Sequence, residues 1–365
     1  MPDSDQASSR LDEMRLRLAA SRRAFILGLL ILVILSLVSV LGATGIGRLQ
    51  ISWKTVIGAI GEGLGLVQSG TVERTPLVVV FDIRLSRVVL SFLVGSALGV
   101  AGSVFQGILR NPLADPFTIG VASGAAFGAA LAFALGWGGT SYLGLGTIPL
   151  LALFGALGAL ALVLMFGRVQ GRLRRDTLVL AGIVVATFLS ALIALIKALD
   201  EEAVSAIVFW VMGSFQGRGW IHVGFSLPYL ILGIYLVMKC ARELDILTLG
   251  EVQARQLGVE VERVRRRLLV GASLLTAAAV SVSGVIGFVG LVVPHLVRMT
   301  MGAAHQRLIV LSAFLGGLGL LWSDVVARTL LRGGEELPVG VVTALVGGPF
   351  FCLLLKRRSG GVILD

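Results

Sequence analysis

Long stretches without a charged residue set the strongest limit on how this chain can fold. A helix needs about 20 apolar residues to cross a bilayer, and 56% of the 365 residues are hydrophobic, with a mean hydropathy of +0.95. The sequence therefore predicts an all-α, polytopic membrane protein. Eight uncharged stretches carry this prediction: 24–47, 88–109, 116–167, 177–196, 219–238, 268–297, 308–323 and 337–355.

Two of these stretches do not hold a single span. Residues 116–167 are long enough for two spans around the glycine-rich turn at 136–146. Residues 268–297 are too long for one span and too short for two. We expect a full span to about Ser283, followed by a short return helix from about Gly287 that Pro294 kinks or ends. This interpretation gives about ten transmembrane helices.

The distribution of basic residues predicts the orientation, because Lys and Arg accumulate in cytoplasmic loops. With a cytoplasmic N-terminus, 22 of the 31 Lys and Arg residues fall inside and 8 outside. We therefore expect a cytoplasmic segment at 1–23, a transmembrane domain at 24–358 and a cytoplasmic tail at 359–365. The first apolar run is long enough to remain as an uncleaved span. The net charge of +10 is spread over these loops, which favours anionic lipid headgroups over nucleic acid as the partner.

The polar stretch RNPLADPFTIG, residues 110–120, separates the second and third spans. A residue before proline leaves the α region, so the second span should end by Asn111. Asp115 followed by Pro116 has the chemistry of a helix start. We expect so tight a turn to hold the two helices side by side. Small residues would then let them approach closely: Gly95 with Gly99, and Gly124 with Gly128.

The longest polar segment, residues 241–267, predicts two short amphipathic helices joined by glycine. Glu251 and Arg255 form an i,i+4 pair, and Gly250 and Gly258 interrupt an apolar surface. The segment could alternatively be a helix that lies on the membrane surface, held there by the arginines that follow it.

Several motifs in order resemble the permease subunits of bacterial ABC importers for iron chelates, haem and cobalamin. The motifs are RLSR (84–87), RNPLADPFTIGVASGA (110–125), LVLAG (178–182), FWVMGSF (209–215), LGEVQARQLG (249–258), SGVIGFVGLVVPHLVR (283–298), SDVVAR (323–328) and ELPVGVVTALVGGPFF (336–351). The resemblance covers nearly the whole chain. It implies a BtuC-like fold of a type II ABC importer permease, with ten spans per subunit.

The resemblance also implies roles for particular residues. The coupling loop, residues 241–267, would be seated on a cytoplasmic ABC ATPase dimer. The residues expected to make this contact are Leu249, Gly250, Glu251, Ala254, Arg255, Leu257 and Gly258. Those expected to dock a periplasmic or lipid-anchored substrate-binding protein are Arg84, Arg87 and Arg328; alternatively, Arg84 and Arg87 reach lipid headgroups.

A second copy of the permease would complete the path, as a homodimer in which the fifth span, 178–197, forms the wall. A cytoplasmic gate is expected at Asn111, Leu113, Arg175 and Asp176. The cargo implied first is a ferric siderophore, with haem and cobalamin as alternatives, and the protein is expected in the inner membrane. Both termini would be cytoplasmic.

The sequence lacks the residues that an ATPase would need, and it offers few of those that an ion-coupled transporter would need. None of the four lysines is preceded by the glycine that a phosphate-binding loop requires, so ATP hydrolysis is expected on a separate chain. An ion-coupled secondary transporter, the alternative from another class, would need ionisable residues at mid-membrane depth. Only Asp324 is a candidate, and Arg328 follows it by one helical turn. We expect no catalytic residues, no cofactor and no metal site, because the three histidines are scattered.

Overall fold

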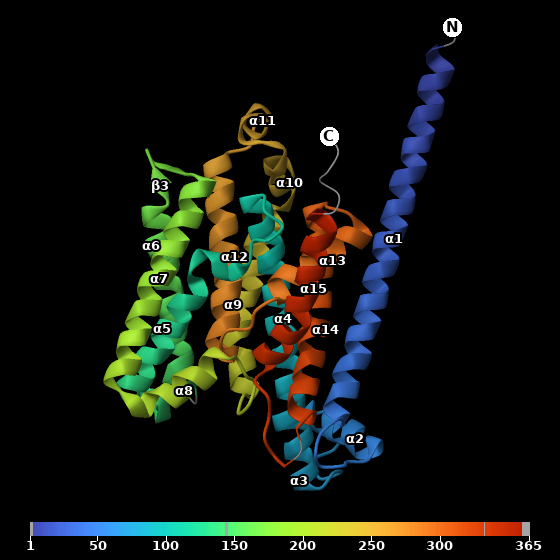
Figure 1. The fold of residues 1–365 in the computed structure, drawn as a ribbon. Coiled ribbons are helices and arrows are strands. Elements are labelled where there is room, and N and C mark those ends of the chain that lie inside the picture. The colour runs from blue at the N-terminus through green and yellow to red at the C-terminus, as the bar shows by residue number, and fades with distance from the viewer. Residues whose placement is uncertain (1–2, 143–144, 332, 360–365) are drawn as a thin grey trace.

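The computed structural model describes residues 3–142, 145–331 and 333–359, and most of them are helical (Figure 1). Among these residues, seven long apolar helices could cross a membrane: α1 (Asp3–Gly45), α4 (Ser86–Leu109), α6 (Thr147–Phe166), α7 (Arg175–Leu199), α9 (Trp220–Lys239), α12 (Val261–Ser283) and α14 (His305–Thr329). Three shorter apolar helices accompany them: α5 (Val121–Ala134), α13 (Val289–Met301) and α15 (Val339–Ser359). The expectation of an all-α fold with about ten spans is confirmed.

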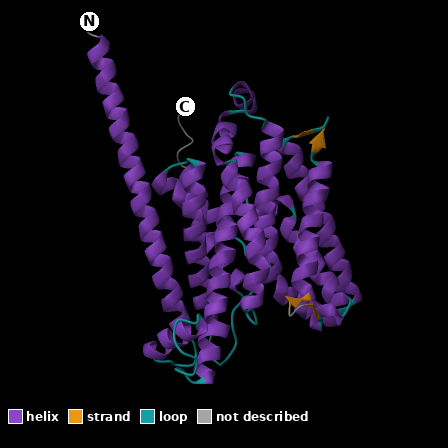
Figure 2. Cartoon of the chain, turned by 180° about the vertical axis from the view of Figure 1, so that it is seen from behind, coloured by secondary structure: helices purple, strands orange, loops and turns teal. Residues whose placement is uncertain are grey.

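The remaining elements lie at the two ends of this bundle. They are α2 (Trp53–Gly63), α3 (Arg74–Leu77), η1 (Val78–Leu85), η2 (Pro116–Ile119), η3 (Trp137–Gly139), α8 (Glu201–Val211), α10 (Ala241–Leu249) and α11 (Glu251–Gln256). Figure 2 shows the strands confined to the ends of the bundle. They form two antiparallel hairpins, β1 (Ser141–Tyr142) with β2 (Leu145–Gly146), and β3 (Arg168–Val169) with β4 (Arg172–Leu173).

The bundle has two distinct ends. The start of α1, strand β3, helix α11 and the end of α15 lie together at the upper end in Figure 1, whereas α2, α3 and α8 lie at the lower end. The charge count assigned the same segments to common sides of the membrane. The structure thus agrees with the sequence on which segments share a side.

Helix α4 lies at the centre of the fold, and most of its residues are buried. It packs against α14, α12 and α13. A Cβ added to Gly95 would lie 2.2 Å from the carbonyl oxygen of Gly316 in α14, and one added to Gly102 would lie 1.8 Å from that of Gly290 in α13. The absence of side chains on α4 is therefore what lets these backbones touch.

The second and third spans were expected to lie side by side, and that prediction is wrong. Helix α5 packs against α6 instead, where Gly124 and Gly128 face the carbonyl oxygens of Gly155 and Leu151. Helix α12 contacts both α4 and α5. The physical reason lies in the connecting segment, which is not a tight turn. It has left-handed backbone at φ 47° after α4 and at φ 77° before α5, and the helix η2 between these two points packs against α7.

The local chemistry of that connection was predicted correctly in part. Helix α4 ends at Leu109, as the proline at 112 requires. The Asp115 carboxylate accepts a hydrogen bond from the Phe117 amide at 3.0 Å, and Pro116 is the first helical residue. This cap, however, starts the 3-10 helix η2, and Gly120 separates it from α5.

The short return helix is also present. Helix α12 ends at Ser283, followed by Gly284 at φ 73°, and α13 begins at Val289. Pro294 lies inside α13 and does not end it, since the helix continues to Met301.

Two glycines of α14 test the close packing of α4. A Cβ on Gly316 would lie 2.4 Å from the Gly95 carbonyl oxygen, whereas one on Gly319 meets nothing within 4 Å. We expect Gly316→Ala to destabilise the protein by about 1–3 kcal/mol through overpacking, and Gly319→Ala to have no such effect. Thermal unfolding in detergent, followed by circular dichroism, measures the difference. Equal melting temperatures for the two variants would contradict this account of the core.

Candidate functional site

The coupling loop forms two short helices, as the sequence predicted. Helix α10 ends at Leu249, and Gly250 at φ 145° separates it from α11. Gly258, at φ 81°, follows α11 and turns the chain toward α12. Both glycines have backbone angles that a residue with a Cβ rarely adopts. Helix α11 stands at the upper tip of the bundle, beyond the end of α12 (Figure 1).

Three large apolar side chains are exposed on this loop, Leu249 at 67%, Val252 at 63% and Leu257 at 62%. We call these three residues the apolar crest. Ala254, another predicted contact residue, is fully buried and packs against the protein core. The crest is therefore the part of the loop that can touch another molecule.

Glu251 connects α11 to the N-terminal part of α12. Its carboxylate accepts a hydrogen bond from the buried Arg265 and lies 3.6 Å from the Arg255 guanidinium. Partial burial alone would raise the pKa of the Glu251 carboxyl, but the hydrogen bond and charge of Arg265 outweigh burial and lower that pKa below its ordinary value. The sequence predicted the pair with Arg255 and missed the stronger one with Arg265, which lies outside helical spacing.

Helix α10 is tied to two transmembrane helices. The Asp245 carboxylate lies 2.6 Å from the His305 Nδ1 atom and accepts a hydrogen bond from the His305 amide at 2.9 Å, at the start of α14. The Arg110 guanidinium, just after α4, donates to the Leu247 carbonyl oxygen. A displacement of α10 would therefore be transmitted to both α4 and α14.

The four residues expected at a cytoplasmic gate lie around one cavity of about 490 Å³. Asn111 and Leu113 belong to the turn after α4, and the Asn111 side chain accepts a hydrogen bond from the Leu113 amide at 2.9 Å. Arg175 and Asp176 begin α7 and form an exposed ion pair at 3.2 Å. The structure thus brings together two turns that are more than 60 residues apart in sequence. Their role as a gate stays a prediction.

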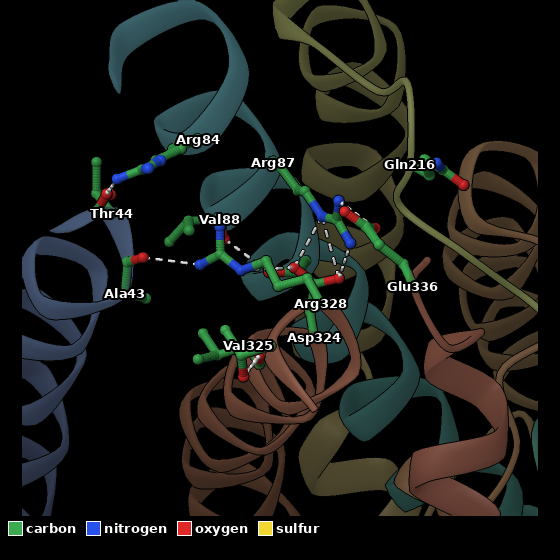
Figure 3. A network of polar contacts seen from close by, with 12 residues as sticks. Ala43, Thr44, Arg84, Arg87, Val88, Gln216, Asp324, Val325, Arg328 and Glu336 are labelled. Carbon is green, nitrogen blue, oxygen red and sulfur yellow. Dashed lines mark hydrogen bonds and ion pairs between the residues drawn. The ribbon is translucent and has the colours of Figure 1, made fainter. Parts of the chain in front are cut away.

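The three arginines expected to dock a binding protein are buried within this subunit, with 5% (Arg84), 8% (Arg87) and 6% (Arg328) of their surface exposed. Arg84 donates to the backbone carbonyls of Gly45 and Leu49 at 3.2 and 2.6 Å. Arg328 donates to the Ala43 carbonyl at 2.7 Å. Figure 3 shows the two side chains directed toward α1.

Arg87 is the centre of a buried ion network (Figure 3). Its guanidinium makes two short contacts with the Asp324 carboxylate, at 2.8 and 3.0 Å, and a third with Glu336 at 2.8 Å. The pair that sequence spacing indicated, Asp324 with Arg328, is present at only 4.0 Å. The main partner of Asp324 lies 237 residues away in sequence, and no local pattern could have indicated it.

The burial of the three arginines bears on the docking prediction, because a docked protein could touch them only if they were accessible. Arg84 lies in η1, a π-helical segment that continues α3 into α4, so the helix that carries Arg84 and Arg87 begins at Arg74. The three arginines are inside the helical bundle and have partners there. Direct contact between these arginines and a binding protein stays a prediction. The alternative, that Arg84 and Arg87 reach lipid headgroups, also stays a prediction.

The histidines occupy separate places. His222 lies 3.2 Å from the Arg218 guanidinium, and His305 belongs with Asp245. Within the described part of the chain, no three His, Cys, Asp or Glu residues form a group that could hold a metal ion.

The contribution of Arg87 to stability can be compared with that of an exposed arginine whose ion pair has the same nitrogen–oxygen distance, 2.8 Å. We expect Arg87→Met to leave the Asp324 carboxylate buried without its main partner and to destabilise the protein by about 3–5 kcal/mol. Arg263 and Glu260 also lie 2.8 Å apart, but both are more than half exposed. Arg263→Met should therefore cost less than about 1 kcal/mol. Unfolding in detergent with increasing denaturant compares the variants, and similar losses for both would refute the structural role.

A comparison with protein families matches residues 29–357 to the FecCD transport family. The chain is 43% identical to YvrB, an uncharacterized ABC transporter permease of Bacillus subtilis (strain 168), over 78% of this chain and 80% of the relative. It is 42% identical to the cobalamin import permease BtuC of Halobacterium salinarum, over 79% and 76%. Identity with the hemin transport permease HmuU of Yersinia pestis is 36%, over 90% and 94%.

The fold agrees with these relatives. A solved structure described as an inward-facing conformation of a metal-chelate type ABC transporter matches with a TM-score of 0.77 and 33% identity, over 90% of this chain and 98% of that one. The apolar helices and the permease relatives indicate a multi-pass protein of the inner membrane. The chain belongs to the FecCD transport family and is an ABC importer permease.

Proposed function

We propose that this permease carries a chelated metal complex, a ferric siderophore in the first instance, from a substrate-binding protein into the cytoplasm, driven by ATP hydrolysis on separate ATPase chains. Relatives named for hemin, cobalamin and Fe(3+) dicitrate leave haem and cobalamin as alternative cargoes. An ion-coupled carrier is not supported, because the buried Asp324 carboxylate is already paired with Arg87.

The apolar crest is the observation that carries this proposal. Three large apolar side chains exposed to water on a short loop favour burial against another protein. The crest is attached through Asp245 to α14 and through Leu247 to α4. A partner that moved the crest would move transmembrane helices as rigid bodies, which ATP-driven transport requires. We assign the crest, with Gly250, Glu251, Ala254, Arg255 and Gly258 behind it, to contact with the cytoplasmic ATPase dimer.

We further propose that two copies of this chain line one path. Helix α7 supports this assignment, since Leu180, Val184 and Phe188 expose about 60% of their surface on it. The gate cavity at the start of α7 would then close the cytoplasmic end of the path, with both termini also in the cytoplasm. Lipid headgroups would bind the basic loops around the bundle.

The binding protein would dock at the lower end, where α2 and α3 lie. The basic side chains exposed there include Lys54 and Arg74, so electrostatic attraction need not involve the buried arginines. In this proposal Arg84 and Arg328 hold α1 against the bundle by their bonds to its carbonyl groups. Arg87 joins α4 to α14, and the three arginines thereby fix the shape of the docking surface.

We expect the purified permease alone to hydrolyse no ATP, because its sequence lacks the phosphate-binding loop. Addition of the cognate ATPase should give hydrolysis that the binding protein stimulates. Phosphate release from proteoliposomes with each component omitted in turn measures this. Hydrolysis by the permease without the ATPase would refute the proposal.

The coupling loop is tested by a substitution that strains its backbone. A β-branched residue at the positive φ of Gly258 costs roughly 1–2 kcal/mol in local conformation, although a Cβ there would meet no neighbour within 4 Å. We expect Gly258→Val to redirect α11 and abolish ATP-driven uptake of labelled cargo into proteoliposomes, with folding intact.

Gly136 provides the matched control. It also has positive φ, at 68°, and a Cβ added there would meet nothing within 4 Å, but it lies between α5 and η3 at the other end of the bundle. Gly136→Val should carry the same local strain and still support uptake. Near-normal uptake by Gly258→Val at equal expression would mean that the loop is a passive connector.

A further inference from the structure

An apolar cavity of about 470 Å³ lies between α5, α7 and α8. Most of its lining is aliphatic or aromatic, including Phe117, Ile193 and Ile207. A neighbouring cavity of about 410 Å³ shares Val211, Met212 and Val285 with it and continues to α15. We call the two together the α8 groove. Helix α8, which contributes Ile207, Val208 and Val211 to the lining, lies at the lower end of the bundle (Figure 1).

Lys197 is the one charged residue among those that line the groove. It lies on α7 with Ser190 and Ile193, at positions i, i+3 and i+7, so the three share one face of that helix. Ser123 contributes a second hydroxyl from α5. Among the described residues, none forms a hydrogen bond or ion pair with the Lys197 ammonium, and the residue is half-buried.

A single cation in an apolar groove favours the binding of a negatively charged molecule over a neutral one. Low-dielectric walls strengthen its attraction for an anion. A neutral molecule that covers the ammonium without accepting a hydrogen bond instead imposes a desolvation cost. Serine hydroxyls nearby can donate further hydrogen bonds to carboxylate or hydroxamate oxygens.

We propose that Lys197, with Ser123 and Ser190, binds an anionic group of the cargo, so that the chelate carried by this importer has net negative charge. This inference rests on the proposed function and narrows its substrate class. The competing role for Lys197 is structural: α7 ends two residues later, at Leu199, and a lysine near a helix end can reach lipid headgroups.

The test uses the complete transporter, with its ATPase and binding protein, in proteoliposomes. The probes are radiolabelled ferric dicitrate and haemin, which are anionic, and cyanocobalamin, which has no net charge. Three variants are compared with the unchanged protein. Lys197→Met removes the charge, and Lys197→Arg keeps it. Lys356→Met removes an exposed lysine near the end of α15, which lines neither the groove nor the proposed docking surface.

We expect ATP-driven uptake of at least one anionic probe, with a KM that rises about tenfold or more in Lys197→Met, the loss expected for one charge-assisted hydrogen bond. Lys197→Arg should stay within about threefold of the unchanged protein, because it retains the charge. Lys356→Met should leave the KM for every probe unchanged. The maximal rate of ATP hydrolysis should be the same in all three, since Lys197 lies far from the coupling loop.

Two results would overturn the inference and leave the importer assignment intact. One is uptake of the anionic probes with an unchanged KM in Lys197→Met, which would make Lys197 a lipid anchor. The other is ATP-driven uptake of cyanocobalamin in preference to both anionic probes. Failure of the proposed function itself would look different, since no probe would then accumulate with ATP and the binding protein would not stimulate hydrolysis.

Discussion

Contacts between backbones along α4 are the constraint on which the rest of the subunit depends. Apolar side chains gain little by leaving lipid for protein, so helices in a bilayer associate where small residues let them come close. Gly95, Gly99 and Gly102 supply such places on successive turns of α4, and each faces a carbonyl oxygen of α14 or α13. One helix thereby fixes two neighbours. The buried pair of Arg87 with Asp324 joins α4 to α14 again, nearer the lower end.

This core gives the coupling loop a rigid body to act on. The loop is attached to α14 through Asp245 and His305, and to the end of α4 through Arg110 and Leu247. These are the two helices whose backbones touch, so a force on α10 cannot move one without the other. Packed cores deform by discrete rearrangement rather than gradually. In the proposed importer, movement of the loop would therefore reach the lower end of the bundle as movement of the α4–α14 pair.

Local chemistry explains which parts of this structure could be predicted from sequence. The ends of α4 and α12 follow from a proline at 112 and from Gly284, which act on their own neighbours in the chain. The two helices of the coupling loop follow in the same way from Gly250. The partners of Gly95 and Gly99 could not be predicted, because a small-residue pattern shows that a helix can be approached closely and says nothing about which helix approaches it.

The burial of the external arginines could not be predicted, for a related reason. A charge count assigns Arg84 and Arg87 to one side of the membrane, and that grouping agrees with the fold, but the count does not say whether a side chain faces water or protein. Their burial depends on Asp324, Glu336 and the carbonyl groups at the end of α1, all distant in sequence. The gate turns show the opposite outcome, since two distant turns expected to act together do line one cavity.

Burial of these arginines also shapes the path proposed for the cargo. Arg87 is neutralised by Asp324 and Glu336, and Arg84 and Arg328 are directed toward α1. None of these three arginines lines the α8 groove. The one cation among the residues that do is Lys197. Several unpaired arginines would hold an anionic chelate too tightly for release, because each charge-assisted bond adds to the free energy of binding. In the proposed path, a single lysine would select a cargo of negative charge. The apolar walls would add no further charge-assisted bond, so the cargo could still be released.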